Sequence, residues 1–449
     1  MSRYNIKKFS FGYALLYFVA YLYFRLYYRR YKVVNRAKIP EKSPVIFAVN
    51  HQNALMDALA VLFATRSQKV FMARADIFRK KFTASLLYFL KILPVYRIRD
   101  GFHSVDQNKE IFKEVIAVME HKRPFCILPE GNHYGEKRLR PLQKGAGRLA
   151  FLAEEVNDFK LGIYIVPVGL DYSNYFNAGS DLLVNFGDPI RIADYQEQYI
   201  QNPVQAIGLL RDNLAAAMKK VIIDISSEVH YKCIYSAIEL YGPVELKRQK
   251  LGNTLLNKFK VKKQLSEMLL SHLPKNETAI SDLKVEMESY EKKIKKYGIK
   301  DWLVAKEKSK PVSFFLGSLL ALLLFPVHFY GMLMNYLPYR LPVYLARKIK
   351  DRHFLSSIRF GAGLFLFIIW YLILIILSFF IFDSILLYLA FIIFLPLSGM
   401  FSFYYYIQLL KLRGKFRWIR LRQKDRKAFD GLVRERKEII LKIEELLRI

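Results

Sequence analysis

The stretch Val45-Ile-Phe-Ala-Val-Asn-His51-Gln-Asn-Ala-Leu-Met-Asp57 carries the clearest structural signal in this chain. Its first part, Val45–Val49, is wholly apolar and is typical of a buried strand. His51 follows where the chain turns into the helical pattern of Leu55–Thr65. Histidine accepts protons near neutral pH, and a carboxylate nearby can bind its other ring nitrogen. The stretch therefore indicates a strand, a turn and a helix that present a base, although Asp57 is equally typical of a simple first-turn helix charge.

Similar alternations of strand and helix signals continue on both sides of this stretch. The candidate strands are Val45–Val49, Val70–Ala73, Pro94–Arg97, Phe125–Leu128, Ile163–Val168 and Leu182–Phe186. The intervening helices are expected at Leu55–Thr65, Val105–His121 and Gly145–Val156. Such alternation predicts the α/β class, with a mostly parallel sheet flanked by helices.

A second polar stretch follows the strand expected at Phe125–Leu128. It reads Pro129-Glu130-Gly131-Asn132-His133, and Lys144-Gly-Ala-Gly then begins the next helix. The N–H groups at a helix start favour phosphate, but the Gly-x4-Gly-Lys-Ser/Thr order of a P-loop is absent. The stretch predicts a polar pocket with basic residues beside it, or else a turn with surface bases.

The composition combines strong positive charge with high hydrophobicity. Among 449 residues, 71 Lys and Arg face 39 Asp and Glu, which gives a formal net charge of +32, and 53% are hydrophobic. A disordered basic tail would be poor in aromatic residues, which here reach 15%. A nucleic-acid-binding protein needs no long apolar runs, and the sequence shows no motif of that class. The combination favours an anionic membrane as partner and argues against nucleic acid.

Three charge-free runs each exceed the roughly 20 residues that cross a bilayer. They are Val312–Tyr339, Phe360–Phe382 and Ser384–Leu410. Only Asp383 separates the last two, which predicts a helical hairpin. Basic residues flank the runs, and the positive-inside rule assigns these flanks to the cytoplasmic side. The first run satisfies this rule as a re-entrant pair broken near Pro326, and a straight span is the alternative.

The order of the polar motifs resembles that of a known family. An Asn-His…Asp follows one strand, an Arg a second, Pro-Glu-Gly a third and Val166-Pro167-Val168-Gly169 a fourth, over roughly residues 43–188. This order resembles the glycerol-3-phosphate and 1-acylglycerol-3-phosphate O-acyltransferase family of membrane-bound glycerolipid enzymes. The resemblance implies a sheet-and-helix domain docked on a membrane.

The resemblance also implies two kinds of site residue. The catalytic pair is His51 as base and Asp57 as its orienting partner. The substrate-binding residues are Arg97 for the phosphate, with Arg99 a close second, Glu130 and Gly131 of the Pro-Glu-Gly motif, and Lys144 of the lysine-glycine element downstream.

Two features depart from the usual family pattern. One residue more than usual lies between His51 and Asp57, which on an unbroken helix would turn Asp57 by about 100°. Contact therefore requires His51 to lie in a loop that absorbs the extra residue. Asn132-His133 also replaces the usual Thr-Arg, which is similar to a eukaryotic-type glycerol-3-phosphate acyltransferase branch with C-terminal membrane helices. His133 is expected beside the site rather than as its base.

The implied reaction is acyl transfer to a hydroxyl of glycerol-3-phosphate or 1-acylglycerol-3-phosphate. The implied donor is a thioester, either acyl-CoA or acyl carrier protein, and the absence of Gly-x-Ser-x-Gly favours direct transfer. The cysteines and histidines lack ligand spacing, so no metal and no cofactor are expected. The alternatives are another lysolipid or aminolipid acceptor, and a non-enzymatic basic membrane adaptor, which would leave His51, Asp57 and Glu130 unexplained.

The sequence divides into five expected segments. They are an interfacial membrane helix with its basic flank (1–39), the acyltransferase α/β domain on the cytoplasmic face (40–190), a charged helical extension (191–310), the membrane region with its re-entrant or spanning segment and helical hairpin (311–410) and a basic C-terminal helix (411–449).

Overall fold

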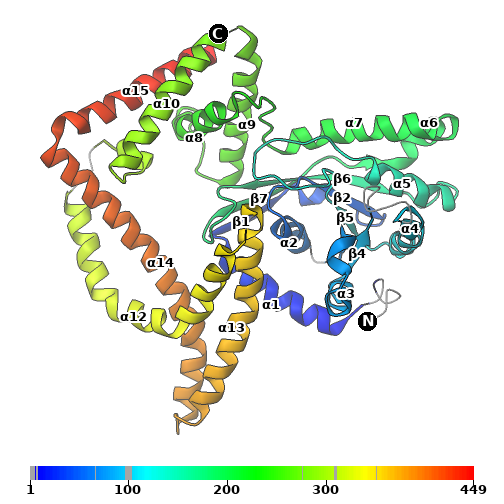
Figure 1. Ribbon diagram of the computed structural model, residues 1–449, viewed down its shortest axis with the longest axis horizontal. Coiled ribbons are helices and arrows are strands. Elements are labelled where there is room, and N and C mark those ends of the chain that lie inside the picture. Colours follow the sequence, from blue (N-terminus) through cyan, green and yellow to red (C-terminus); the bar gives the residue numbers. More distant parts are fainter. Residues whose placement is uncertain are drawn as a thin grey trace. The chain divides into compact units, whose positions relative to one another are not determined.

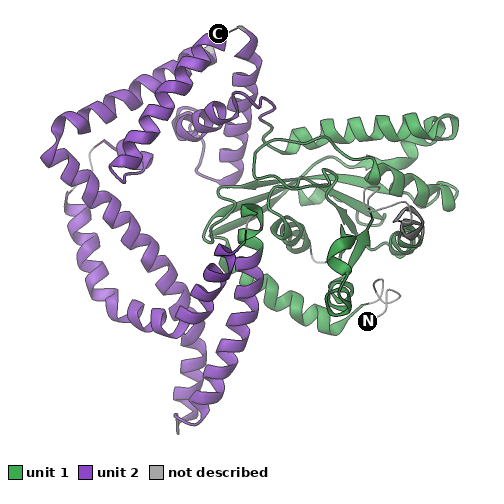
Figure 2. Cartoon of the chain, in the orientation of Figure 1, with its two compact units in different colours: residues 1–224, 349–357 green, residues 225–348, 358–449 purple. Residues whose placement is uncertain are grey.

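The computed structural model describes residues 6, 9–65, 67–96, 104–275, 277–307, 311–349 and 351–448. The chain divides into two compact units, coloured separately in Figure 2. Unit 1 comprises Met1–Asp224 and Ile349–Ser357, and unit 2 comprises Ile225–Lys348 and Ile358–Ile449. This division into two units does not test the five segments expected from the sequence, which stay a prediction.

Unit 1 is a sheet with helices packed on it (Figure 1). Its strands are β1 (Arg30–Val34), β2 (Val45–Val49), β3 (Val70–Arg74), β4 (Ile92–Val95), β5 (Phe125–Ile127), β6 (Tyr164–Tyr172), β7 (Asp181–Phe186) and β8 (Ile190–Arg191). Its helices are α1 (Phe11–Tyr27), α2 (Leu55–Ala64), α3 (Lys81–Phe89), α4 (Ser104–Glu120), α5 (Gly145–Val156), α6 (Gln196–Gln201) and α7 (Pro203–Val221). Short 3-10 turns lie at Arg36–Lys38, Ala75–Phe78 and Ile192–Tyr195.

The described strands form one mixed sheet that is mostly parallel. Their order is β1-β7-β6-β2-β5-β3-β4, and β8 pairs with β6. Neighbours pair in parallel except β6–β7 and β6–β8, which are antiparallel. The predicted α/β class is therefore confirmed. The central strand β2 is buried at every position, which explains its unbroken apolar sequence.

Strand β1 was not predicted, because its sequence Arg30-Tyr-Lys-Val-Val reads as a basic flank. It pairs with β7 and brings Arg29 and Arg30 to the buried carboxylate of Asp181, at 2.6 and 2.5 Å. Part of the basic flank predicted for the N-terminal segment therefore forms ion pairs inside unit 1. The sequence had suggested only contact with a membrane for this flank.

The main core of unit 1 joins one face of the sheet to three helices. Ile46 and Ala48 of β2 pack with Ile111 of α4, Leu149 of α5 and Leu210 of α7. Alternate residues of a strand face opposite sides, so Phe47 lies on the other face, where it contacts Phe186. The carboxyl end of β2 thus emerges from a tightly packed layer.

The end of α7 packs closely against β6 at Gly169. A Cβ built on Gly169 would overlap the carbonyl oxygen of Val221 and lie 2.7 Å from its carbonyl carbon. Only glycine fits here, which gives a packing reason for the last residue of the Val-Pro-Val-Gly motif.

Helix α1 covers the stretch for which an interfacial membrane helix is predicted. Its buried side includes Tyr13 and Phe24, whereas its exposed side presents a stripe of large apolar residues. These are Phe11, Leu15, Phe18, Leu22 and Leu26. A stripe at helical spacing that no described residue of unit 1 covers is typical of a helix that lies along a membrane surface.

Unit 2 is helical over its described residues (Figure 1). Its helices are α8 (Tyr231–Arg248), α9 (Leu255–His272), α10 (Glu277–Lys296), α11 (Asp301–Val304), α12 (Pro311–Arg347), α13 (Leu355–Phe379, of which the first three residues belong to unit 1), α14 (Ile385–Lys424) and α15 (Arg426–Arg448). Helix α10 lies in the stretch expected to be a charged helical extension, and it buries Ile280, Leu283, Met287 and Tyr290 along one side.

Three described helices are long and apolar enough to cross a membrane. They are α12, the stretch Arg352–Phe379 that includes α13, and α14. Helices α13 and α14 are joined through a short loop that contains Asp383, as the sequence predicted.

Helix α12 shows no break near Pro326, and whether this run re-enters or spans a membrane stays a prediction. Helix α12 continues through Pro326, Pro338 and Pro342, and its ribbon changes direction along its length in Figure 1. A proline inside a helix removes one backbone hydrogen bond and kinks the helix without necessarily ending it. Contact with α14 supports the kinked helix, since Gly331 packs on the backbone of Ser398.

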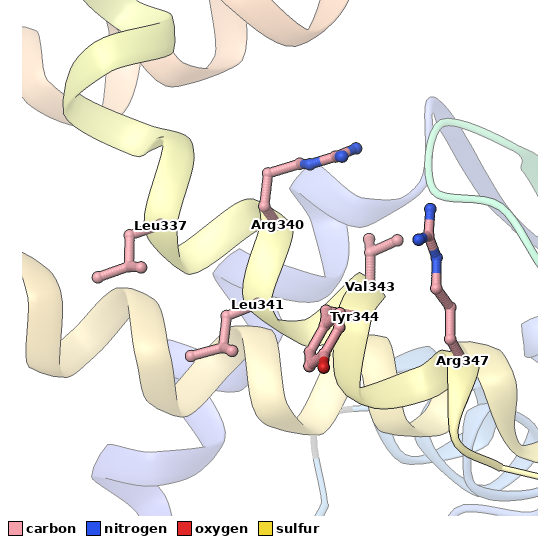
Figure 3. A pocket seen from close by; sticks show the side chains of 6 residues that line it. All are labelled: Leu337, Arg340, Leu341, Val343, Tyr344 and Arg347. Carbon is pink, nitrogen blue, oxygen red and sulfur yellow. The ribbon is translucent and has the colours of Figure 1, made fainter.

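The last turns of α12 are both apolar and basic. Leu337, Leu341 and Tyr344 line a shallow hollow of about 280 Å³ with Arg340 and Arg347 (Figure 3). The two arginines lie seven residues apart and hence on similar sides of the helix. Such a mixture is typical of a helix end at the boundary between hydrocarbon and headgroups.

Candidate active site

The predicted pair of His51 and Asp57 comes together in the structure. Asn50 and His51 follow directly on β2, and α2 begins only at Leu55. His51 Nδ1 lies 2.9 Å from Asp57 Oδ2. The histidine side chain is 13% exposed and the aspartate side chain is fully buried. This bond fixes the ring orientation and leaves Nε2 as the nitrogen able to receive a proton.

The extra residue between His51 and Asp57 is absorbed in the loop before α2. Ala54, at the start of the helix, has φ of 44°, a conformation that L-residues rarely adopt. This sharp turn wraps the backbone around the carboxylate. Asp57 Oδ2 accepts hydrogen bonds from the backbone N–H groups of Gln52 and Asn53, at 2.7 and 2.6 Å. The contact between His51 and Asp57, which the longer spacing allows only if a loop absorbs the extra residue, is therefore formed.

Two further contacts hold this catalytic turn, residues 50–57. The Asn50 side chain exchanges hydrogen bonds with the backbone of Leu170 on β6, at 3.2 and 2.7 Å. The hydroxyl of Tyr172, also on β6, donates to Asp57 Oδ1 at 2.8 Å. Four donors therefore surround the Asp57 carboxylate, which offsets the cost of burying its charge.

Glu130 lies against the same turn. Its carboxylate accepts a 2.8 Å hydrogen bond from the backbone N–H of His51 and a 3.4 Å bond from that of Arg140. Burial raises the pKa of Glu130 to about 8, although both N–H donors oppose this shift. In this structure Glu130 braces the backbone of His51.

The raised pKa of Glu130 predicts a pH-dependent contribution to stability. A carboxyl whose folded-state pKa exceeds its ordinary value stabilises the fold fully below that value, and the contribution is lost as pH rises through the folded-state pKa. The window runs from 4.5 to about 8. We expect Glu130→Gln, which cannot ionise, to lose less thermal stability than the unmodified protein as pH rises across this window. Thermal unfolding in detergent, with exposed Glu41→Gln as control, measures this, and a difference that does not change with pH would contradict it.

The structure describes some of the remaining predicted binding residues and not others. Gly131 has φ of 70°, which glycine adopts freely, and it turns the chain after Glu130. Lys144 precedes α5 as its N-cap residue. Arg97 and Arg99 lie outside the described residues.

Sequence reasoning missed Lys137 and Tyr172. Lys137 is 3% exposed and forms an ion pair with Asp171, while its ammonium also donates to the carbonyl of Tyr172. Tyr172 follows the Val-Pro-Val-Gly motif by three residues and reaches Asp57. The alternation of β6 could have placed Tyr172 on a sheet face, but nothing local predicts its partner.

A distant part of the chain completes the surroundings of the turn. This returning segment, Ile349–Ser357 without residue 350, belongs to unit 1 although it follows α12 in sequence. The hydroxyl of Ser357 accepts a 3.2 Å hydrogen bond from the backbone N–H of Leu55, and the hydroxyl of Ser356 donates to the side-chain oxygen of Asn53. The segment thus satisfies polar groups at the start of α2.

His133 lies between the catalytic turn and the returning segment. Its ring centroid is 5.3 Å from that of His51 and 4.7 Å from that of Phe354. Burial lowers the pKa of His133, and nearby His51 adds to this effect, whereas Asp351 opposes it. The expectation that His133 neighbours the site agrees with this position.

Comparisons found known proteins that this chain resembles. The Acyltransferase family model matches residues 30–171. Glycerol-3-phosphate O-acyltransferases 2 and 1 of Saccharomyces cerevisiae are 24% and 25% identical over 204 and 208 residues, 45% of this chain in each case. The chain covers 26% of the length of each yeast relative. The crystal structure of the 1-acyl-sn-glycerophosphate acyltransferase PlsC from Thermotoga maritima aligns at a TM-score of 0.30 and 15% identity, over 44% of this chain and 81% of that one.

A mostly parallel sheet that carries a His-Asp pair at the end of its central strand defines an acyltransferase domain at residues 30–171. The match of this domain to the Acyltransferase family and its similarity to the two yeast glycerol-3-phosphate O-acyltransferases confirm the predicted resemblance to glycerolipid acyltransferases.

Proposed function

We propose that this chain is a membrane-bound O-acyltransferase that moves a fatty acyl group from a thioester to a hydroxyl of a glycerol-3-phosphate-type acceptor. The observation that carries this proposal is the 2.9 Å contact of His51 with the fully buried Asp57. A surface histidine with a chance acidic neighbour would not have a partner enclosed by four donors. The position of the pair inside the stretch that matches the Acyltransferase family supports this chemistry.

The proposed reaction is a direct transfer with His51 as general base. Nε2 of His51 takes the hydroxyl proton while the hydroxyl oxygen attacks the thioester carbonyl carbon. Asp57 stabilises the imidazolium that forms. The carbon–sulfur bond then breaks, and the departing thiolate takes the proton back from His51. Atoms and charge balance, and the products are an ester and a free thiol.

The proposed acceptor bears a phosphate and is glycerol-3-phosphate or 1-acylglycerol-3-phosphate. Arg97 and Lys144 are the proposed phosphate ligands, since guanidinium and ammonium groups bind phosphate strongly. Gly131 lets the chain turn beside the acceptor, and Glu130 holds the base in place. The names of both yeast relatives support this acceptor class.

The proposed donor is acyl-CoA or acyl carrier protein, and the proposed location is a membrane with the acyltransferase domain on its cytoplasmic face. The exposed apolar stripe of α1 supports contact of unit 1 with a bilayer. The three long apolar helices support anchoring, and the basic flanks of α12 and α14 support a cytoplasmic orientation.

An acceptor panel tests this function. The purified protein, given long-chain acyl-CoA or acyl carrier protein, is expected to acylate phosphate-bearing glycerol acceptors faster than neutral ones. Arg97→Ala and Lys144→Ala should raise KM for the phosphate-bearing acceptors by roughly tenfold or more each, because each loses a charge-assisted hydrogen bond.

Lys160→Ala serves as the matched control, since Lys160 is exposed and lies far from the turn in sequence. Equal losses on phosphate-bearing and neutral acceptors would refute the phosphate role. Absence of transfer to every acceptor and from both donors would refute the function.

A further inference from the structure

Three metal-ligating side chains gather beside the catalytic turn. Among the residues that the structure describes, His133, Asp351 and His353 each offer a ligand atom within 4.8 Å of the other two. His133 comes from the loop after the Pro-Glu-Gly motif, and the other two come from the returning segment, so all three belong to unit 1. The acyl-transfer proposal uses none of them.

The separations within this cluster suit a small cation. His133 Nε2 lies 3.5 Å from Asp351 Oδ2, and His353 Nδ1 lies 2.9 Å from Asp351 Oδ1. In a tetrahedral site with metal–nitrogen bonds of about 2.0–2.1 Å, neighbouring ligand atoms are about 3.3 Å apart. These two distances, which reach different oxygens of Asp351, bracket this value. All three ligand atoms lie within 4.8 Å of one another, so side-chain rotations that bring them together would seat an ion.

The surroundings hold the two segments close together. Phe354 packs its ring edge-to-face on His133, and a Cβ on Gly135 would come within 3.2 Å of the His353 ring. The cluster is therefore assembled by packing before any ion binds, which lowers the cost of forming a site.

Charge and access also favour a cation. Two neutral imidazoles and one carboxylate give a donor set with a single negative charge, which suits a dication and disfavours a phosphate. The side chain of Asp351 is 47% exposed, whereas those of His133 and His353 are 12% and 26% exposed. An ion can enter from the Asp351 side and keep water or a substrate oxygen as a further ligand.

We propose that His133, Asp351 and His353 form a binding site for a divalent transition-metal ion of the Zn²⁺ class. Two imidazoles and one carboxylate are the donor set that such ions prefer over Mg²⁺ or Ca²⁺. The ion would tie the returning segment to the loop that contacts His51. It would thus fix the wall of the acceptor site without taking part in proton transfer.

Cobalt substitution tests this site directly. The full-length protein, purified in detergent with a tag that contains no histidine and stripped with chelator, is titrated with Co²⁺ and then Zn²⁺. We expect one Co²⁺ per chain with visible d–d absorption, displaced by one Zn²⁺. His353→Ala and Asp351→Asn should each weaken binding by at least about tenfold. His121→Ala is the matched control, since His121 is an exposed histidine of the same unit that bonds only locally to Ala117.

Two outcomes would overturn the site. One is the absence of stoichiometric Co²⁺ or Zn²⁺ binding, and the other is equal binding by the control and by both cluster variants. Circular dichroism of each variant separates loss of the site from loss of the fold. Metal binding is read without any acyl-transfer assay, so failure of this proposal and failure of the proposed function are distinguishable.

Discussion

Alanine in place of His51 is expected to reduce kcat for acyl transfer by roughly 10²–10⁴-fold, the range that a positioned general base contributes. His51 is the group whose Nε2 can take the hydroxyl proton, since Nδ1 is bound to Asp57. KM for the acyl donor should change little, because the side chain acts on the reacting hydroxyl. Steady-state kinetics with a long-chain thioester measure both constants.

A graded series around Asp57 sharpens this test. Asp57→Asn should lose nearly as much, because removal of an orienting carboxylate costs up to about 10⁴-fold where it supports a catalytic histidine. Tyr172→Phe removes one charge-assisted hydrogen bond to Asp57, worth about 1.5 kcal/mol, and should cost about tenfold. Asp188→Asn, at an exposed aspartate that pairs with Lys38, is the control. Full activity of His51→Ala would exclude the proposed mechanism.

The second large effect is on stability and concerns Gly169. Gly169→Ala places a methyl group onto the carbonyl oxygen of Val221, at the end of α7. That carbonyl cannot move freely, because it also accepts a 3.3 Å hydrogen bond from the buried Asn185 side chain. Helix α7 would have to shift away from β6. We expect a loss of more than about 3 kcal/mol, at the upper end of the cost of overpacking a core.

Gly145→Ala is the matched control for this substitution. Gly145 begins α5, and a Cβ built there meets no atom of the described chain within 4 Å. Alanine should leave the free energy of unfolding unchanged or raise it by about 0.5–1 kcal/mol, because it reduces the freedom of the unfolded chain. Denaturant titration followed by far-ultraviolet circular dichroism, which reports on both units, compares the two variants. Similar stabilities for both variants would refute the close approach of α7 to β6.

Local patterns predicted most of the sheet and its helices. The apolar run of β2 and the helical spacing of α5 are strong signals, and both elements have the predicted bounds. Strand β1 was not predicted because its basic residues pair with Asp181, which lies far along the chain, and no local pattern indicates this contact. Helix α12 continues through Pro326 because packing on a neighbouring helix can override a local helix-breaking signal.

In the candidate site, too, local contacts could be predicted from the sequence and long-range contacts could not. His51 and Asp57 lie six positions apart, so a motif could suggest their contact, and the loop around Ala54 completes it. Tyr172 and the returning segment reach the turn only through the tertiary fold. No spacing rule joins His133 to Asp351, which explains why the sequence suggested no metal ligands.

The returning segment has a consequence for attempts to excise the acyltransferase domain. A recombinant fragment that ends at Asp224 would contain every described strand of the sheet, and the match to the Acyltransferase family would seem to justify that boundary. It would nevertheless lack Ser356 and Ser357, the partners of Asn53 and Leu55 beside the catalytic histidine. A fragment with a native sheet and poor turnover is therefore the expected product, and adding Ile349–Ser357 through a designed linker is the rational repair.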